Sequence, residues 1–293
     1  MTKRDLIILG IFITLIGFQY INRLAIDFRE NISNSQFGVR KEKVDYFTGI
    51  DLEAKSAIVW DARDNRVLYG KNERAQLPLA SLAKIMTVFV ALEAGETIAT
   101  MPSEYTGEEW SLSTMAKLTL VSSANDGASS LAAAWVSFER LRGKDIPFTE
   151  AMNERAKTLG LSQTYFLNTT GLDISSGING AYGSAENMAR LFYKAVTAYP
   201  DVFEATGKDR VTLVSLANKK RIVRNTNDGV EKMAGIVASK TGFTKLAGGN
   251  LVILSDLGIN HPVVISVLGS SEKGRFTDAE KLLSVAIEAI SGE

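Results

Sequence analysis

Apolar and polar positions divide the chain into a short tail, one long apolar run, a polar stretch and a patterned remainder. Residues 6–21 carry no charge, residues 22–54 are mixed and polar, and from residue 55 apolar positions recur at strand or helix spacing. A long uncharged apolar run is typical of a membrane segment. We therefore expect a cytoplasmic tail over 1–5, a transmembrane anchor over 6–21, a tether over 22–54 and a folded domain, large enough for an enzyme, over 55–293.

The flanks of the apolar run favour an anchor that is not cleaved. Its length lies between that of a signal-peptide core, roughly 7–15 residues, and that of a full span, roughly 17–25 residues. No small-x-small cleavage site follows Ile21. Lys3 and Arg4 precede the run, and basic residues stay on the cytoplasmic side. The sequence therefore predicts a single-pass protein of the cytoplasmic membrane whose domain lies outside the cytoplasm.

From residue 55 onward the spacing of apolar residues predicts a mixed domain. Residues 57–61 and 67–70 are typical of a β-hairpin. Expected helices lie at 78–95, 115–121, 126–140, 148–159, 185–199 and 276–290. Expected edge strands lie at 211–214 and 220–224, and expected central strands lie at 236–240, 250–254 and 263–268. Short connections between the last strands predict an antiparallel sheet on which the last helix packs.

Composition removes several classes of function. The chain has 293 residues with 33 basic and 33 acidic side chains, so its net charge gives no footprint for nucleic acid. It contains no cysteine, which excludes disulfides, cysteine nucleophiles and thiolate metal sites. His261 is its only histidine, so paired-histidine zinc sites lack ligands, and we interpret it as a loop residue before a strand. We expect no metal and no cofactor.

A lysine interrupts the apolar helix that begins near Pro78. Ser81 and Lys84 are three residues apart and share one helix face, near the end whose dipole favours negative charge. A serine becomes nucleophilic when a base takes its proton, and lysine can be that base when burial or another cation lowers its pKa. The same pattern also fits an N-cap serine followed by a lysine that reaches water. A second match, Ser270 to Lys273, lies in a polar turn and is interpreted as accidental.

Three short strings occur in one order along the chain. They are Ser81-x-x-Lys84 at the start of the apolar helix, Ser123-Ala-Asn125 between two helices, and Lys240-Thr-Gly242 at a strand end. In these contexts, over roughly residues 55–290, the chain resembles the serine D-alanyl-D-alanine carboxypeptidases. These are the low-molecular-mass penicillin-binding proteins of peptidase family S11. The resemblance implies an α/β (α+β) fold of the β-lactamase/transpeptidase type, with a helical subdomain inserted at about 97–200.

The resemblance also implies roles for the first two motifs. Ser81 resembles the acylated nucleophile and Lys84 its general base. Ser123 matches the serine that relays a proton toward the leaving amine, and Asn125 matches the amide that holds the substrate's peptide. We further expect Lys240, if it lies close by, to depress the pKa of Lys84.

The third motif is expected to recognise the substrate's free end. Lys240 and Thr241 match the pair that binds the terminal carboxylate, and Gly242 is expected to leave room for it. The backbone N–H groups of Ser81 and Phe243 would form the oxyanion hole. The family often carries a histidine at the position of Phe243, so this departure concerns substrate detail rather than acylation.

The implied substrate is a peptidoglycan stem peptide ending in D-Ala-D-Ala, with β-lactam antibiotics as covalent inhibitors. Three alternatives remain open. A D,D-endopeptidase acting on cross-links uses the same site, and a non-catalytic wall-binding or penicillin-sensing module would retain it. A class A β-lactamase needs a Glu-x-x-x-Asn loop, whereas Glu150 and Asn153 are one residue too close, and Ala124 stands where that class has aspartate.

Overall fold

The computed structural model describes residues 46–95, 98–100 and 108–292. Residues 46–293 form one structural unit of their own. The predicted tail and anchor and most of the predicted tether lie outside the described residues. Among the residues that are described, no helix is both long and apolar enough to cross a membrane.

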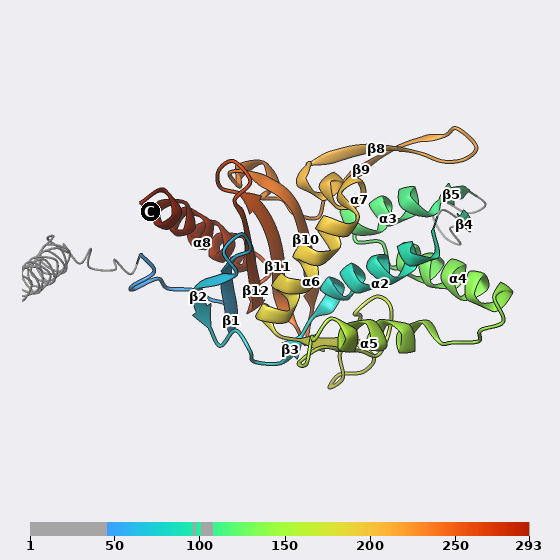
Figure 1. The fold of residues 1–293 in the computed structure, drawn as a ribbon, viewed down its shortest axis with the longest axis horizontal. Helices are drawn as coiled ribbons and strands as arrows, with labels where there is room; N and C mark the ends of the chain where they lie inside the picture. The colour runs from blue at the N-terminus through green and yellow to red at the C-terminus, as the bar shows by residue number, and fades with distance from the viewer. Residues whose placement is uncertain (1–45, 96–97, 101–107, 293) are drawn as a thin grey trace, which may run out of the picture. The chain divides into compact units, whose positions relative to one another are not determined.

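A five-stranded antiparallel sheet forms the centre of the unit (Figure 1). Its strands, in spatial order, are β10 (Ile236–Thr244), β11 (Gly248–Asp256), β12 (Pro262–Ser270), β1 (Ser56–Asp61) and β2 (Arg66–Lys71). Helix α8 (Gly274–Ser291) contacts β11 and β12, while α6 (Ala185–Ala198) lies across the other side and contacts β1, β11 and β12. Because both faces are covered, every residue of β1 is buried.

The predicted antiparallel sheet and terminal helix are confirmed, but three strands were placed wrongly. The predicted edge strands form a separate two-stranded hairpin, β8 (Arg210–Val214) and β9 (Lys220–Arg224). β10 was predicted to be central and is instead an edge strand of the sheet in the described part of the chain. The burial of its middle residues is explained by contacts with short helical turns, which cover it in place of a sixth strand.

Short elements and helices surround the sheet, mostly on the α6 side (Figure 1). The helices are η1 (Ala80–Leu82), α2 (Ala83–Ala91), η2 (Leu92–Ala94), α3 (Leu112–Val121), α4 (Asn125–Leu141), α5 (Phe148–Thr158), α7 (Pro200–Phe203), η3 (Glu204–Gly207) and η4 (Val230–Lys232). The short strands are β3 (Leu77–Pro78), β4 (Ile98–Thr100), β5 (Glu109–Ser111), β6 (Tyr165–Phe166) and β7 (Ala181–Gly183).

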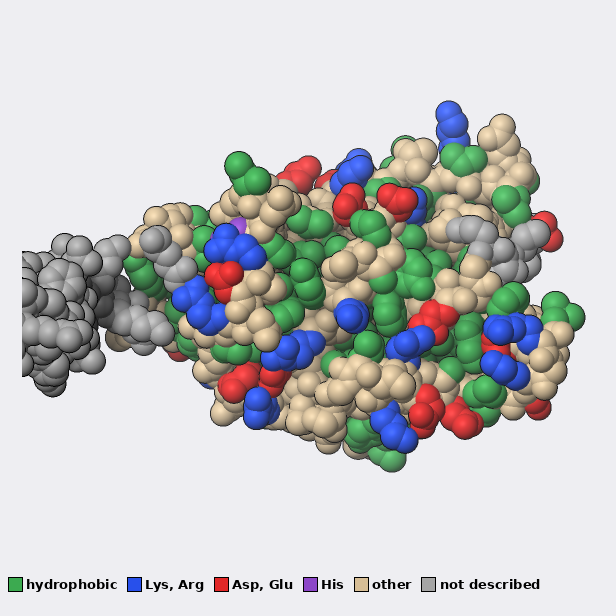
Figure 2. Space-filling view, viewed as in Figure 1, with side chains coloured by type: hydrophobic (Ala, Val, Ile, Leu, Met, Phe, Trp, Pro, Cys, Tyr) green, Lys and Arg blue, Asp and Glu red, His purple; other side chains and the backbone are tan. Residues whose placement is uncertain are grey.

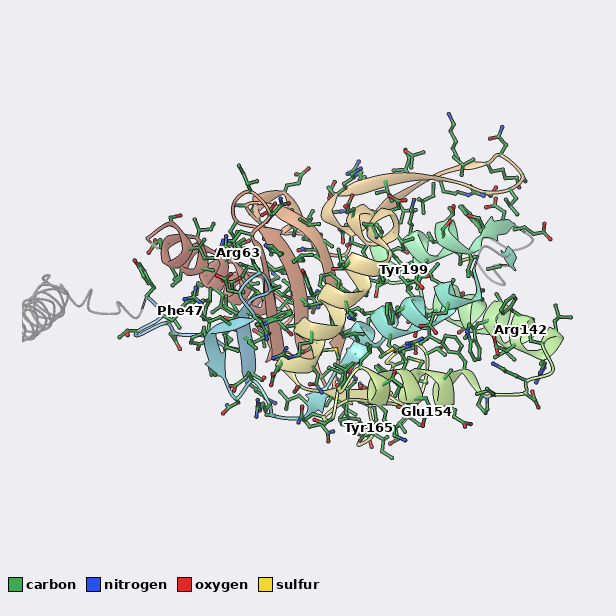
Figure 3. The ribbon with its side chains drawn as sticks, viewed as in Figure 1. Phe47, Arg63, Arg142, Glu154, Tyr165 and Tyr199 are labelled. Carbon is green, nitrogen blue, oxygen red and sulfur yellow. The ribbon has the colours of Figure 1, made fainter. Side chains whose placement is uncertain are left out.

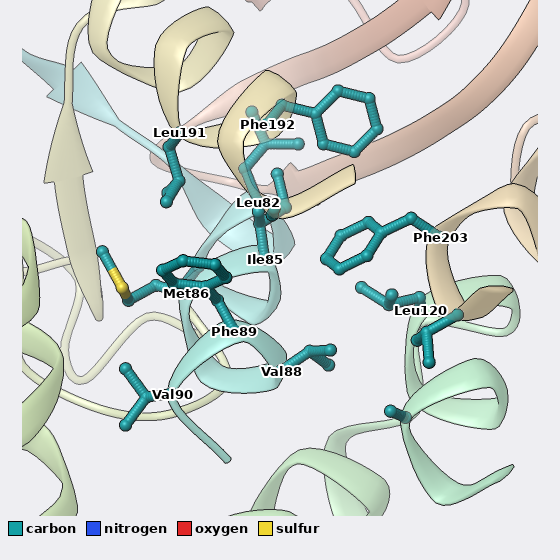
Figure 4. Close-up of a cluster of buried hydrophobic side chains, with 14 of the residues drawn as sticks. Leu82, Ile85, Met86, Val88, Phe89, Val90, Leu120, Leu191, Phe192 and Phe203 are labelled. Atoms are coloured by element: carbon teal, nitrogen blue, oxygen red, sulfur yellow. The ribbon is translucent and has the colours of Figure 1, made fainter. Parts of the chain in front are cut away.

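Helix α2 is the centre of the larger hydrophobic core. All nine of its residues are buried, in agreement with the apolar run of its sequence. Its apolar side chains belong to one cluster of buried residues together with Leu120 of α3, Phe192 of α6 and Phe203 of α7 (Figure 4). Complete burial of this kind holds the first turn of α2, and with it Ser81 and Lys84, in a fixed position.

The folded unit begins earlier than the predicted boundary at residue 55. Phe47, Leu52 and Ala54 are buried in the smaller core beneath α8. The ring of Phe47 stacks on Tyr69 of β2, with centroids 5.3 Å apart (Figure 3). Apolar residues scattered through a polar stretch gave no periodic signal, so the sequence alone did not separate this segment from the tether.

Candidate active site

Ser81 lies at the start of the buried helix in a tight backbone arrangement. β3 leads into η1, where Ala80 has a positive φ of 49°. Gly171 fits against this turn because a Cβ atom there would meet the carbonyl oxygen of Ala80 at 1.8 Å. Its φ of 75° is also readily available only to glycine. The loop around Gly171 and the turn carrying Ser81 therefore hold each other in place.

Lys84 faces Ser81 from one turn further along the chain. Its Nζ atom is 2.9 Å from Ser81 Oγ and 2.9 Å from the carbonyl oxygen of Thr170. The side chain is fully buried, and burial lowers the pKa of Lys84 to about 7. A good fraction of the amine is thus neutral near pH 7, and a neutral amine can accept the serine proton. The alternative in which Lys84 reaches water is wrong.

The second motif meets the third through one hydrogen bond. Ser123 lies between α3 and α4 with a positive φ of 57°, and its Oγ accepts a hydrogen bond of 2.9 Å from Lys240 Nζ. Lys240 also donates to the carbonyl oxygen of Thr241 at 2.7 Å. Asn125 is exposed at the first position of α4. The structure thus brings together side chains that are 117 positions apart.

The two lysines of the site are both buried and repel each other. Burial is the main cause of the lowered pKa of Lys84. Lys240 is itself buried, and its pKa is lowered well below the usual value, first by burial and then by the charges of Lys84 and Arg275. Each lysine thus disfavours the charged form of the other.

β10 runs beside η1 with almost no space between the two backbones. A Cβ atom at Gly242 would lie 2.9 Å from the carbonyl oxygen of Leu79 and 3.1 Å from the amide nitrogen of Ser81. Glycine is therefore needed there to admit the nucleophile's own backbone, whereas the sequence suggested only room for substrate. The next residue, Phe243, is exposed at the rim.

Three contacts of the site were not predicted from the sequence. The Thr170 carbonyl accepts from Lys84, and the hydroxyl of Thr226 lies 2.6 Å from that of Thr241. Arg275, in the first turn of α8, donates from Nη1 to the carbonyl oxygen of Gly242 at 2.8 Å. Backbone carbonyls and long-range partners carry no spacing signal.

His261 has a structural role at the ends of β1 and β12. It is a loop residue directly before β12, as predicted, but it is buried, and its Nε2 lies 3.0 Å from Asp61 Oδ2. Ligand atoms of Asp61, Asp64 and His261 lie within 4.8 Å of one another, a spacing that could hold a metal ion. Arg63 already pairs with Asp64, and Arg66 lies 3.6 Å from Asp61, so cationic side chains already neutralise these carboxylates.

The residues weighed for a β-lactamase are used differently. Asn153 in α5 donates to the carbonyl oxygen of Phe166 and accepts from its amide, at 2.9 and 2.8 Å. Glu150 lies exposed on the first turn of the same helix. Asn153 thus fixes the loop after α5, and Glu150 has no place in the described site.

Comparison with known proteins agrees with the geometry. A sequence model of the Peptidase_S11 family, described as D-alanyl-D-alanine carboxypeptidase, matches residues 41–106 and 100–272. The D-alanyl-D-alanine carboxypeptidase DacF of Bacillus subtilis is 31% identical over 252 residues, 80% of this chain and 62% of that protein. The D-alanyl-D-alanine endopeptidase of Pseudomonas aeruginosa is 30% identical over 250 residues, 79% of this chain and 76% of that protein.

Solved structures show the same likeness. Penicillin-Binding Protein D2 from Listeria monocytogenes, in its ampicillin-bound form, matches with a TM-score of 0.68 and 30% identity. The match covers 80% of this chain and 98% of that one. The chain thus spans less than two thirds of the length of DacF and nearly all of the Listeria structure. With its family match covering most of the chain, the protein belongs to the S11 peptidases, the D-alanyl-D-alanine carboxypeptidase family.

Proposed function

We propose that the protein is a serine D-alanyl-D-alanine carboxypeptidase that works through an acyl-enzyme at Ser81. The observation that carries the proposal is the buried Lys84 amine, 2.9 Å from the Ser81 hydroxyl and with a pKa of about 7. Such an amine is a general base poised near working pH. Family membership and the order of the other motifs agree with this chemistry.

In the proposed acylation step, four polar side chains take part: Ser81, Lys84, Ser123 and Lys240. Neutral Lys84 takes the proton of Ser81 as Oγ attacks the carbonyl carbon of the penultimate D-Ala. The carbonyl oxygen becomes an oxyanion, for which we assign the N–H groups of Ser81 and Phe243 as donors. Ser123, hydrogen-bonded to Lys240, relays the proton that Lys84 took from Ser81 to the amine of the leaving D-Ala as its C–N bond breaks, which leaves Lys84 neutral again. Water then hydrolyses the ester, releasing the shortened peptide and Ser81.

The remaining motif residues would hold the substrate. Lys240 and the hydroxyl of Thr241, itself positioned by Thr226, form the subsite for the free terminal carboxylate. Asn125, exposed at the start of α4, is placed to bind the peptide backbone. By this proposal the substrate is a peptidoglycan stem peptide, and β-lactams acylate the same serine. Residues 6–21 would anchor the chain in the cytoplasmic membrane.

An endopeptidase is the second candidate because some similar proteins carry that name. The Pseudomonas aeruginosa relative is a D-alanyl-D-alanine endopeptidase at 30% identity. Both reactions use the same acylation machinery, and they differ in whether a free D-Ala or a cross-linking residue follows the cut bond. Comparing a free stem peptide with a cross-linked dimer distinguishes them.

The proposal is tested by release of D-alanine from diacetyl-L-lysyl-D-alanyl-D-alanine. The wild-type protein is expected to release D-Ala, and Ser81→Ala is expected to release none above background. Ser113→Ala, a serine at the start of α3, is a matched control that should behave as wild type. Cleavage of cross-linked dimers without release from the free peptide would favour the endopeptidase instead.

The rate of acylation should fall on the acid side of neutrality. Below a pKa of about 7 Lys84 is protonated and cannot accept the serine proton, so the second-order rate with penicillin should drop about tenfold per pH unit. Stopped-flow or gel labelling between pH 5 and 8.5 measures this. His261→Gln should keep the same acid limb, since the chain's one histidine lies outside the site. A flat profile, or a limb lost in His261→Gln, would remove Lys84 as the base.

A further inference from the structure

The β8–β9 hairpin stands apart from the main sheet with one face uncovered. Its inner face carries Leu213 and Val223, which are buried in the larger core. Arg221 on the same face pairs with the buried carboxylate of Glu108, and Leu216 N donates to the carbonyl oxygen of Glu109 at 2.9 Å. Contacts of one face and of the turn therefore attach the hairpin to the rest of the domain, and the other face is exposed.

The open face alternates cations with aliphatic side chains. Along β9, Lys220, Ile222 and Arg224 are all exposed, Ile222 at 75% of its surface. On β8, Val214 lies opposite Lys220. Figure 2 shows basic and hydrophobic side chains standing out where the hairpin projects from the molecule. Single exposed hydrophobic residues are common on protein surfaces, but neighbouring ones on a single face indicate an interaction site.

Basic side chains outnumber acidic ones in this segment, although the whole chain is neutral. Residues 208–224 contain six basic side chains and one acidic one, Asp209. Lys219 and Arg221 pair with the buried Glu108, and Arg210 and Arg224 pair with Asp209 and Asp228, so Lys208 and Lys220 are the two cations of this segment outside these ion pairs. Cations around exposed aliphatic groups match the interface of a bilayer that contains anionic lipids, where lysine and arginine stems reach the headgroups. The neutral total hides this local charge.

The chain between the domain and the apolar run is long enough to permit such contact. Residues 22–45 could extend over roughly 80 Å at about 3.3–3.6 Å per residue. A domain of this size is expected to measure about 45 Å across. The tether is therefore long enough for the hairpin to reach the membrane, regardless of the point at which the tether joins the domain.

We propose that the open face of the β8–β9 hairpin docks on the surface of a bilayer containing anionic lipid and so orients the domain on its own membrane. This inference rests on the proposed anchoring of residues 6–21, not on the catalytic assignment. Ile222, Val214 and Leu216 would enter the interface, with Lys220 and Arg224 on phosphate groups.

The lack of native cysteine allows a direct test. Full-length protein with one cysteine at Ile222, labelled with an environment-sensitive dye, is reconstituted into phosphatidylcholine vesicles with or without phosphatidylglycerol. The label should shift to the blue and be quenched by spin-labelled lipid only with phosphatidylglycerol. The same label at Ile259, which is 97% exposed, should stay in water. Lys220→Gln with Arg224→Gln should weaken the response about 25-fold in lipid titration, at roughly fivefold per cation, whereas Lys157→Gln with Lys194→Gln should not.

The outcomes separate docking from the other proposals. A label at residue 222 that stays as exposed as one at 259 overturns the docking, as does an equal response to soluble polyglycerol phosphate. Loss of the protein from vesicles in carbonate would disprove the anchor alone, because the label on added vesicles still reports hairpin contact. Penicillin labelling of the same samples reports the catalytic proposal independently.

Discussion

Replacing Lys84 with alanine is expected to lower the rate of acylation by about 10²–10⁴-fold, the usual contribution of a general base. Lys84 is the one buried amine within hydrogen-bonding distance of Ser81 Oγ among the described residues. Its removal deprives the hydroxyl of this base. The second-order rate of labelling by fluorescent penicillin measures the loss.

Stability must be separated from chemistry in this experiment. The alanine opens a cavity in a closely packed core, which costs about 2–5 kcal/mol, and Lys84→Met keeps the volume while removing the base. Thr87→Val is a matched control, because Thr87 also ties α2 to the same loop through the Thr169 carbonyl at 2.6 Å. Both lysine variants should be inactive with a cooperative melt, and Thr87→Val should remain active. Rates within tenfold of wild type in folded Lys84→Met would exclude Lys84 as the base.

Lys240→Gln is expected to cost most of the activity on a substrate with a free terminal carboxylate and little on the matching amide. A charge-assisted contact contributes about 1.5–3 kcal/mol, equivalent to roughly 10- to 150-fold in rate. Wild-type protein should therefore prefer the acid over the amide by that factor, and the variant should lose the preference. Paired rates on peptides ending in D-Ala-D-Ala and in its amide measure both.

The neighbouring Lys245 provides the control for this prediction. It is exposed directly after β10, so Lys245→Gln changes the same charge without touching the site. A general electrostatic effect would appear in both variants, whereas recognition by Lys240 appears in one. Equal wild-type rates on acid and amide would contradict the carboxypeptidase assignment and favour cutting of cross-links.

Periodic segments were predictable, and their partners in the sheet were less so. The α2 region and the first hairpin follow from local apolar spacing, which tertiary packing only reinforces. The edge position of β10 could not be predicted, because short helical turns bury an edge strand as fully as another strand would. Likewise, the hairpin of β8 and β9 alternates as an edge strand does, and only its contacts show that it is separate.

Contacts in the active site likewise divide into local ones, which the sequence predicts, and long-range ones, which it does not. Ser81 and Lys84 are close because helical geometry brings them together, so their spacing sufficed. The hydrogen bond from Lys240 to Ser123 depends on the whole fold, and the resemblance to a family implied only that their two motifs belong to one site. Burial in the apolar helix was one of the two causes that the sequence offered for a lowered pKa of Lys84, and the structure shows that this side chain is fully buried. Arg275 was missed because its partner is a backbone carbonyl.

The central claim is a covalent acyl-enzyme on Ser81, and intact mass spectrometry with peptide mapping tests it most directly. Full-length protein mixed with excess benzylpenicillin should gain one penicilloyl group per chain, located on the peptide that contains Ser81, and should release it slowly. Ser81→Ala should gain none while keeping its melting transition. An adduct that persists in folded Ser81→Ala, or many turnovers of penicillin per minute without a trapped adduct, would contradict the account.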